Sequence, residues 1–223
     1  MSDHATPVVR HALAGSGIEL VASCGIAAYD ARAPEAYRSA ALMPSARGVV
    51  VAASAGPGLW REFLPRMQAA PHRWSDPHPY DMFVAELLGR ADRALAAAGI
   101  AFRRFEAAFH APIPLHFVAL GQLVGLGSVG PFALLIHPEH GPWWALRGAW
   151  LVDADVDPPL DPRPPCLGCS APCVGGWQNA TGRVDAATLA VRSRCVVGQA
   201  SRYDDDQIAY HYDRTTTVDR LRR

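Results

Sequence analysis

The clearest pattern of apolar and polar positions lies between Asp81 and Ala98, where apolar side chains recur every three to four residues. This spacing places them along one face of an α-helix, and Gly99 follows at the position where a glycine commonly ends a helix. Shorter patterns of the same kind predict four further helices. These are residues 1–16, 59–67, 114–124 and 204–212.

Short apolar or alternating runs predict strands between these helices. The run at residues 48–53 is rich in valine, and the others either alternate or are apolar throughout. The predicted strands are residues 19–28, 48–53, 102–109, 132–137 and 143–152. Because the strands fall in groups and do not alternate strictly with helices, the pattern predicts an α+β fold.

Composition changes after residue 152. The segment 153–172 contains six prolines, at positions 158, 159, 162, 164, 165 and 172, so it cannot form regular structure. We therefore expect an α+β core at residues 1–152. A proline- and cysteine-rich loop and a C-terminal helix at residues 153–223 would complete the same domain.

Charge narrows the range of partners. The 223 residues include 21 arginines, no lysine and 21 acidic residues, so the formal net charge is zero. A neutral chain is not typical of general nucleic-acid binders or polybasic membrane-surface proteins, and the absence of lysine excludes lysine Schiff-base chemistry. No apolar run reaches the roughly 20 residues of a membrane span, and the first 20 residues do not resemble a signal peptide. We therefore expect a cytoplasmic protein.

Four cysteines form the strongest local motif. Cys166, Cys169 and Cys173 follow one another with gaps of two and three residues, and a gap of 21 residues separates Cys173 from Cys195. Four thiolates suit a 4Fe–4S cluster or a tetrahedral zinc ion, although the spacing matches neither the zinc-ribbon nor the bacterial ferredoxin pattern. We expect a 4Fe–4S cluster, with zinc and free thiols as alternatives. Cys24, in an apolar run, is interpreted as a small core residue.

A glycine-rich loop follows the predicted helix at residues 114–124. Gly125, Gly127 and Gly130 have the spacing of a dinucleotide-binding fingerprint, but that fingerprint lies between a strand and a helix. Here the loop lies between a helix and a strand, so we do not expect a Rossmann fold. The glycines would allow close approach of a large flat ligand, and the alternative is a helix stop followed by a tight turn.

One arginine has the sequence context of an anion-binding residue. Arg147 lies between Trp144 and Trp150 on a predicted strand, and a guanidinium binds a carboxylate through two parallel hydrogen bonds. A structural ion pair is the alternative. His137 and His140 flank a turn, where histidines are more often hydrogen-bonded turn residues than metal ligands.

Several segments resemble known families. Residues 125–136 (GLGSVGPFALLI) resemble a glycine-rich stretch of epoxyqueuosine reductases, which also have a cysteine-rich loop about 30 residues later and an Arg-Cys pair like Arg194-Cys195. Residues 76–100 (DPHPYDMFVAELLGRADRALAAAGI), 136–148 (IHPEHGPWWALRG) and 202–210 (RYDDDQIAY) resemble the cobalamin-processing CblC family more evenly. These matches are ordered and similarly spaced over residues 76–212, whereas the first 75 residues contribute little.

The resemblance implies a flavin-nitroreductase-like core sheet with flanking helices and a bound cobalamin. Trp143 and Trp144 would lie close to the corrinoid, and Arg147 and Arg202 occupy positions that the CblC family ties to glutathione use. The cofactor-binding residues implied are Gly125, Gly127, Ser128, Gly130, Trp143, Trp144, Arg147 and Arg202.

The expected function is therefore that of a cobalamin-binding reductase. It would remove the upper axial ligand, cyanide or an alkyl group, from a small-molecule corrinoid, with a cluster, a flavin or glutathione supplying electrons. No residue is an unambiguous catalytic acid, base or nucleophile, so a non-catalytic cobalamin carrier is an alternative. The sequence gives no indication of the oligomeric state.

Two departures from the related families matter. Epoxyqueuosine reductases have an acidic residue before the glycine helix, where this chain has Phe109-His110-Ala111-Pro112, and they have cysteines for two clusters. A tRNA-modifying reductase is therefore disfavoured, although a corrinoid and iron–sulfur reductase related to that family remains an alternative. Animal CblC proteins lack the cysteine cluster.

Overall fold

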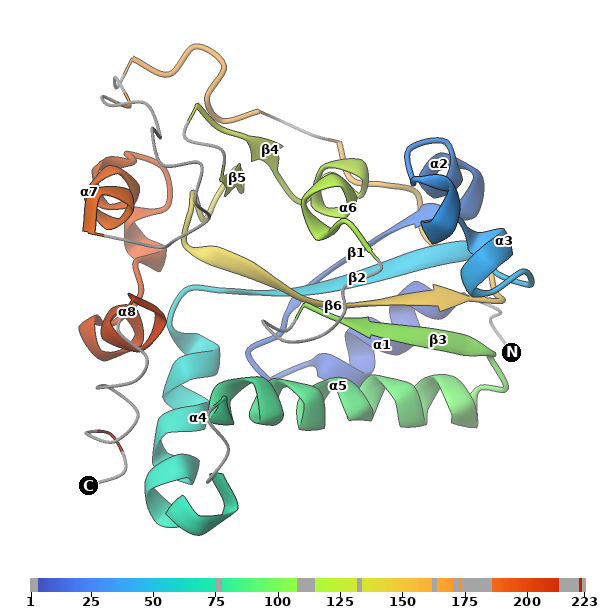
Figure 1. Ribbon diagram of the computed structural model, residues 1–223, viewed down its shortest axis with the longest axis horizontal. Coiled ribbons are helices and arrows are strands. Elements are labelled where there is room, and N and C mark those ends of the chain that lie inside the picture. The colour runs from blue at the N-terminus through green and yellow to red at the C-terminus, as the bar shows by residue number, and fades with distance from the viewer. Residues whose placement is uncertain are drawn as a thin grey trace.

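The computed structural model describes residues 4–74, 78–107, 115–131, 134–161, 164–170, 173, 186–212 and 221. A four-stranded antiparallel sheet lies at its centre, with helices on both faces (Figure 1). The strand order is β1-β2-β6-β3, so β1 and β3 form the edges. The strands are β1 (Leu20–Gly25), β2 (Gly48–Ala55), β6 (Trp144–Val152) and β3 (Phe102–Glu106).

The two central strands, β2 and β6, explain why the sequence shows continuous apolar runs. They pair from Gly48 opposite Val152 to Ala55 opposite Trp144, with one irregularity at Ala52 and Ala53. Every residue of β2 except the last is buried. A sheet covered on both faces needs apolar side chains on both sides of its central strands, which removes the usual alternation.

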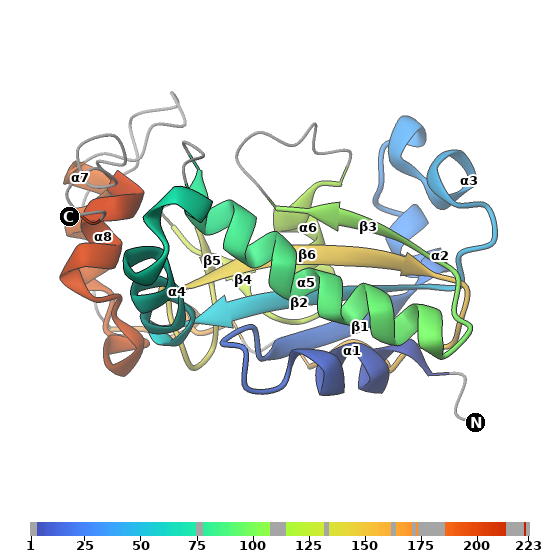
Figure 2. The ribbon, with the colours of Figure 1, turned by 90° about the horizontal axis from the view of Figure 1, so that it is seen from below.

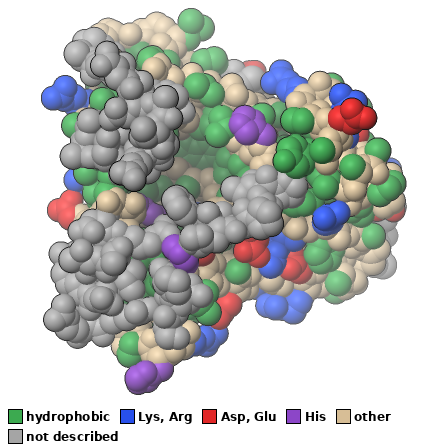
Figure 3. Space-filling model, in the orientation of Figure 1, with side chains coloured by type: hydrophobic (Ala, Val, Ile, Leu, Met, Phe, Trp, Pro, Cys, Tyr) green, Lys and Arg blue, Asp and Glu red, His purple; other side chains and the backbone are tan. Residues whose placement is uncertain are grey.

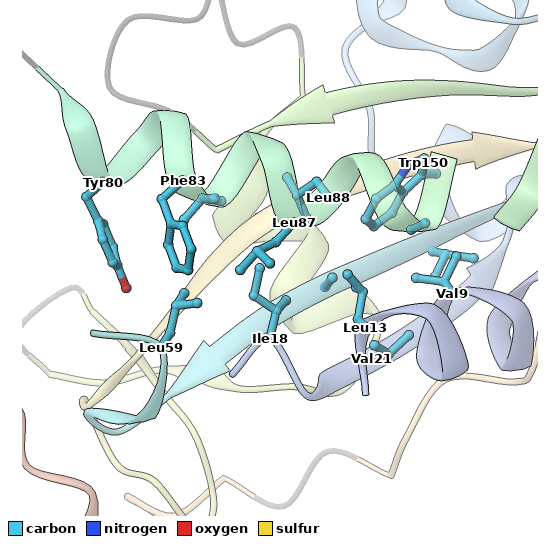
Figure 4. Packing of buried hydrophobic residues seen from close by; sticks show 14 of the residues in the cluster. Val9, Leu13, Ile18, Val21, Leu59, Tyr80, Phe83, Leu87, Leu88 and Trp150 are labelled. Carbon is cyan, nitrogen blue, oxygen red and sulfur yellow. The ribbon is translucent and has the colours of Figure 1, made fainter. Parts of the chain in front are cut away.

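Three helices cover the lower face of the sheet. These are α1 (Ala5–Leu13), α4 (Gly58–Ala69) and α5 (Pro79–Ala97), with α1 and α5 side by side beneath the strands (Figure 2). Figure 4 shows Leu13 of α1 on the side of this core that faces Leu87 and Leu88 of α5, and Val9 of α1 below Trp150. Gly99 ends α5 at a φ of 72°, so the glycine C-cap and the amphipathic helix predicted from sequence are both confirmed.

Short helices cover the upper face. They are α2 (Ile26–Asp30), the 3-10 helix η1 (Glu35–Tyr37), α3 (Ser39–Leu42) and α6 (Phe117–Leu123). Their core includes Val49, Val51 and Leu151 from the central strands. Cys24 is fully buried here, and burial raises the pKa of its thiol to about 11. Its interpretation as a small core residue is confirmed.

Several short elements from the second half of the chain lie at one end of the sheet, where β2 ends and β6 begins (Figure 1). A two-stranded sheet, β4 (Ser128–Val129) and β5 (Leu135–Ile136), lies there with α7 (Ala186–Arg194), η3 (Gln199–Ser201) and α8 (Asp205–Tyr212). A further 3-10 turn, η2 (Pro71–Trp74), precedes α5.

The mixed α+β class predicted from sequence is confirmed, with several corrections. The strand predicted at residues 19–28 ends at Gly25, because the amide of Ile26 donates to the carbonyl of Arg47 and the chain then turns into α2. Of the strand predicted at 132–137, the described residues contain only Leu135–Ile136, and helix α7 was not predicted. Parts of the predictions at 102–109 and 114–124 lie outside the described residues. Among the described helices, none is both long and apolar enough to cross a bilayer.

Candidate functional site

Arg147 is the fourth residue of β6, toward the end of the sheet beside which α7 and α8 lie (Figure 1). Strand β6 presents it beside Ser54 of β2 and Tyr80 at the start of α5. Its Nε donates to the hydroxyl of Ser54 at 2.8 Å, and its Nη2 donates to the hydroxyl of Tyr80 at 3.3 Å. The guanidinium carbon also lies 5.0 Å from the centre of the Tyr80 ring.

This arginine is a buried charge with neutral partners. Its side chain is only 8% exposed, and no carboxylate forms an ion pair with it among the described residues. A buried guanidinium without a counterion is costly, and such a group gains when a ligand supplies a carboxylate or phosphate. Burial raises the pKa of Tyr80 by more than the neighbouring Arg147 lowers it. The phenol is therefore protonated at neutral pH and can donate or accept a hydrogen bond.

A second group of cations surrounds Trp143, which is fully buried just before β6. Arg192 of α7 lies 4.5 Å from the Trp143 ring centre and 4.7 Å from that of Tyr203. Arg202 lies 5.9 Å from the Trp143 ring and donates to the carboxylate of Asp205 at 3.0 Å. Within the described residues, Nε1 of Trp143 and Nε of Arg192 are buried without a hydrogen-bond partner.

Arg147 and Arg202 contact different aromatic side chains, and their role toward glutathione stays a prediction. Arg147 contacts Tyr80, and Arg202 contacts Trp143. The ring of His211 lies between the two groups, 5.8 Å from both Tyr80 and Tyr203. The two cations thus belong to adjacent parts of one aromatic cluster.

The glycine loop approaches the protein's own segments closely. Gly125 has a φ of 78°, and a side chain there would overlap the backbone of Leu160. A side-chain carbon on Gly127 would lie 2.8 Å from Cζ2 of Trp144 and 3.1 Å from the carbonyl oxygen of Ile136. Both glycines are therefore required by packing, and their contact with a ligand stays a prediction.

The same loop lies beside the cysteines. A side-chain carbon on Gly130 would lie 3.6 Å from Sγ of Cys166. Ser128, in β4, has a buried hydroxyl without a hydrogen-bond partner among the described residues. Trp144, the neighbour of Gly127, is buried and donates from Nε1 to the carbonyl of Leu135 at 3.0 Å. The loop therefore connects the aromatic end of β6 with the cysteine-containing segment.

His137 and His140 are hydrogen-bonded turn residues, as predicted. Nδ1 of His137 accepts from the backbone amides of Glu139 and His140 at 3.1 and 3.2 Å. Burial and the nearby His140 lower the pKa of His137 to about 4, so its ring is neutral at pH 7. His140 contacts the hydroxyl of Ser201 through Nδ1 at 2.8 Å.

All four predicted cysteine ligands line one pocket of about 120 Å³. Pro131, Pro165, Val191 and Arg194 are among its other lining residues. Cys195 follows α7 directly and is buried, whereas Cys169 is exposed. As the side chains stand, no three His, Cys, Asp or Glu residues of the described ranges are grouped closely enough to hold a metal ion. Metal binding therefore stays a prediction.

The thiols of this pocket influence one another. Burial and then the neighbouring Cys173, Cys195 and Cys169 raise the pKa of Cys166. Burial, Cys173 and Cys169 raise the pKa of Cys195, against a hydrogen bond from the backbone of Val197 that lowers it. Because their pKa values lie above the ordinary thiol value, these two groups are protonated thiols at neutral pH and poor nucleophiles.

A tight backbone contact joins Cys195 to the aromatic site. Gly141, in the turn before β6, and Gly198 approach so closely that a side chain on either would overlap the other segment. Both have a positive φ, at 55° and 75°. The side-chain amide of Gln199 donates to the carbonyl of Cys195. The position of the fourth cysteine is therefore fixed against the turn that leads into Trp143.

Sequence analysis did not identify Ser54, Tyr80 and Arg192 as site residues. Ser54 was the single hydroxyl in an otherwise apolar strand, which is a signal for a buried polar contact. Tyr80 lies within a segment that resembles the CblC family, but it belongs to no recognisable functional motif. Arg192 belongs to a helix that was not predicted.

Comparison with known proteins gives a likeness in structure alone. No protein-family model matches the chain, and no curated protein matches it. A C. elegans B12-trafficking protein, CblC, described as a human MMACHC homologue, superposes with a TM-score of 0.62 at 13% identity, covering 98% of this chain and 94% of that one.

Two solved structures of epoxyqueuosine reductase match part of the chain. One, labelled with selenomethionine, gives a TM-score of 0.50 over 75% of this chain and 50% of that one, at 16% identity. The other, with a tRNA stem loop, gives 0.51 over 75% and 49%, also at 16%. The chain thus corresponds to about half of each reductase and to nearly all of the CblC protein. At these identities the comparison establishes a shared fold, and that fold is the one found in the CblC protein.

Proposed function

We propose that this protein is a cobalamin-binding reductase that removes the upper axial ligand of a cob(III)alamin. The observation that carries the proposal is the agreement in fold with a B12-trafficking CblC protein over 98% of the chain. The ordered sequence resemblances at residues 76–212 support it independently. We propose that the core is nitroreductase-like, that residues 153–223 complete one domain with residues 1–152, and that the protein acts in the cytoplasm.

The reaction proceeds by one of two balanced routes. One electron added to cyanocob(III)alamin weakens the cobalt–carbon bond, so that cyanide leaves and cob(II)alamin remains. For an alkyl ligand, an external thiolate attacks the alkyl carbon, forming a thioether, and the electron pair of the broken bond stays on cob(I)alamin. In both routes the corrinoid undergoes the chemistry, while the protein binds it and controls access.

Arg147 is the proposed anchor for the carboxylate of a thiol reductant such as glutathione. Its buried guanidinium has hydroxyl partners in Ser54 and Tyr80 and no carboxylate among the described residues. An incoming carboxylate would therefore supply the missing counter-charge. Arg202, already bonded to Asp205, is a weaker candidate for a second contact. A flavin is the alternative donor.

Cys166, Cys169, Cys173 and Cys195 are the proposed ligands of one metal centre, a 4Fe–4S cluster in preference to zinc. Their donor set fits, because four sulfur atoms line one pocket and no carboxylate or imidazole is among its described lining residues. A bound cluster would supply electrons one at a time. The pKa values of the metal-free Cys166 and Cys195 thiols are raised, which disfavours their attack on an alkyl group. Ligation also requires the thiolates, so metal binding here should release protons.

The test of the function is anaerobic titration with cyanocobalamin, followed by addition of a reductant. We expect co-elution with the protein, a shift in the visible spectrum, and conversion to cob(II)alamin at a rate above that of the reductant alone. Binding without acceleration would indicate a carrier. No binding at micromolar protein would contradict the proposal. Gly127→Val should weaken binding by displacing Trp144, which a side chain there would contact at 2.8 Å.

The Arg147 assignment is tested by Arg147→Lys, which keeps the charge but loses the planar fork. We expect glutathione-dependent turnover to fall at least tenfold while cobalamin binding is retained. Arg93→Gln, on the exposed outer side of α5, is the matched control and should change neither. Equal losses of turnover and binding in Arg147→Lys would indicate a structural role.

The metal assignment is tested by analysing anaerobically purified protein for iron, sulfide and zinc. We expect about four irons and four sulfides per chain, the composition of one 4Fe–4S cluster, with loss in Cys169→Ser. The control is Cys24→Ala, because Cys24 is buried within the core of the sheet's upper face. Metal-free protein of unchanged stability would contradict the assignment.

A further inference from the structure

A second, larger cavity lies on the upper face of the sheet, away from the cysteine pocket. Its volume is about 610 Å³, and α2, the η1 segment and the first two turns of α6 form its walls. This volume lies within the range of about 300–1,000 Å³ that is typical of small-molecule sites. Neither Arg147 nor any of the four pocket cysteines lines it.

The walls of this cavity are apolar and aromatic. Leu115, just before α6, and Phe117, Leu120 and Leu123 of α6 contribute from one side, and Ala33 and Pro34 contribute from the opposite side. Figure 3 shows hydrophobic side chains gathered over the region of α2 and α6. Tyr37 and Val118, both among the lining residues, are 39% and 40% exposed, so apolar surface continues out to the mouth. A ligand with an apolar body would gain free energy by covering this surface.

The polar groups that remain in the cavity are cationic or neutral. The hydroxyl of Tyr29 already donates to the carbonyl of Tyr37 at 2.6 Å. Arg32 and His116 are exposed lining residues, and their side chains form no hydrogen bond or ion pair within the described part of the chain. None of the described lining residues is acidic. A negatively charged group on a ligand here would therefore contact a guanidinium that has no ion-pair partner among the described residues.

We infer that this cavity binds a free aromatic carboxylate, with its ring system between α6 and the η1 segment and its carboxylate at Arg32. The apolar walls select a planar ring body, and the arginine selects the anion through two parallel hydrogen bonds. This inference does not depend on the proposed corrinoid chemistry, because it uses none of the residues assigned to the corrinoid or the metal. It adds an organic-acid site on the upper face of the sheet.

The experiment compares an acid with its neutral analogue. Binding of 2-naphthoate and of 2-naphthamide is measured by calorimetry on the full chain, because the two share the ring body and differ in charge. We expect a dissociation constant of order 0.1 mM for the acid, in keeping with its small size, and binding of the amide at least fivefold weaker. In Arg32→Gln the two should bind equally, and in the control Arg93→Gln the preference should persist.

A second variant tests the location without touching the charge. Ala119→Phe places a larger side chain on a half-buried lining position of α6, so it should reduce binding of both compounds while leaving the circular dichroism spectrum unchanged. Equal affinity for acid and amide in the natural protein would overturn the inference, as would retention of the preference in Arg32→Gln.

Corrinoid competition separates this inference from the proposed function. Cobinamide lacks the nucleotide tail of cobalamin, so displacement of naphthoate by cobalamin but not by cobinamide would assign the cavity to the corrinoid's own tail and overturn the free-acid site. If naphthoate binds with the expected selectivity while no corrinoid binds at all, the proposed function fails and the aromatic-acid site stands.

Discussion

The core beneath the sheet and the sheet end near the C-terminal helices differ in whether their buried polar atoms have hydrogen-bond or ion-pair partners. Beneath the sheet, α1, α4 and α5 bury carbon against carbon, and the indole of Trp150 donates to Asp92 at 2.8 Å. At the end of the sheet beside the C-terminal helices, Arg147 is buried with two hydroxyl partners. Buried atoms of Trp143 and Arg192 there have no hydrogen-bond partner among the described residues. The first region is built for stability, and the second retains polar groups that a ligand could satisfy.

The largest effect is expected from the stabilising region. Trp150 is fully buried on β6 between α1 and α5, so Trp150→Ala should lower the free energy of unfolding by about 3–5 kcal/mol. The measurement is urea unfolding followed by circular dichroism. A loss below about 1 kcal/mol would show that this side contributes less to stability than its packing indicates.

A smaller loss is expected at the contact between the two regions. Gly141→Ala places a methyl group against the backbone of Val197 at a residue with a φ of 55°. The variant should lose about 2–3 kcal/mol from overlap and backbone strain, and it should also hold less metal, because the segment after Cys195 must move. Gly99→Ala also has a positive φ but has open space around it, so it should keep its metal content. Unchanged metal content in Gly141→Ala would show that this turn does not position the cysteine ligands.

The pH dependence tests the turn at His137. Its pKa is about 4 in the folded state, against about 6.5 when unfolded. Between these values the unfolded state binds more protons, so stability falls as pH decreases from about 6.5 to about 4. Allowing for partial exposure, the loss is about 1–2 kcal/mol. His137→Asn keeps an acceptor for the two amides without titrating, and it should reduce the difference in unfolding free energy between pH 7 and pH 4.5. An identical pH dependence in both proteins would contradict this assignment.

The smallest effect, and the one of opposite sign, is expected at Arg147. Replacing a buried unpaired charge by an apolar side chain of similar length is often neutral or stabilising, so Arg147→Met should raise the free energy of unfolding by about 1 kcal/mol. The same variant should lose affinity for carboxylate ligands. Thermal unfolding and glutathione titration measure the two effects. A clear loss of stability would place Arg147 among the structural residues and remove the contrast between the two regions.

The elements predicted most accurately from sequence are those with a clear local repeat of apolar residues. Helix α5 was predicted at Asp81–Ala98 and observed at Pro79–Ala97, because its apolar residues repeat at helical spacing and Gly99 ends it. Helix α2 was hidden in the continuous apolar run from Glu19 to Ala28, where periodicity cannot distinguish a strand from a buried helix.

Site geometry was less predictable because it joins distant segments. Arg147 was singled out by its position between tryptophans, but its partners Ser54 and Tyr80 come from two other elements and carry no motif. Spacing grouped Cys166, Cys169 and Cys173, whereas the place of Cys195 beside them depends on α7 and on the turn at Gly141. The glycines of the loop were interpreted as a ligand cradle, yet their contacts with Trp144, Ile136 and Leu160 follow from tertiary packing.

The burial of Cys24 has a practical consequence for chemical labelling. A thiol enclosed in the core with a pKa near 11 presents almost no thiolate to a maleimide at pH 7. In native protein the reagent would therefore report on the partly or fully exposed Cys166, Cys169 and Cys173, and a bound cluster would protect these three. Mass shifts of intact protein, counted before and after unfolding, would then measure occupancy of the cysteine pocket chain by chain, without any change to the sequence.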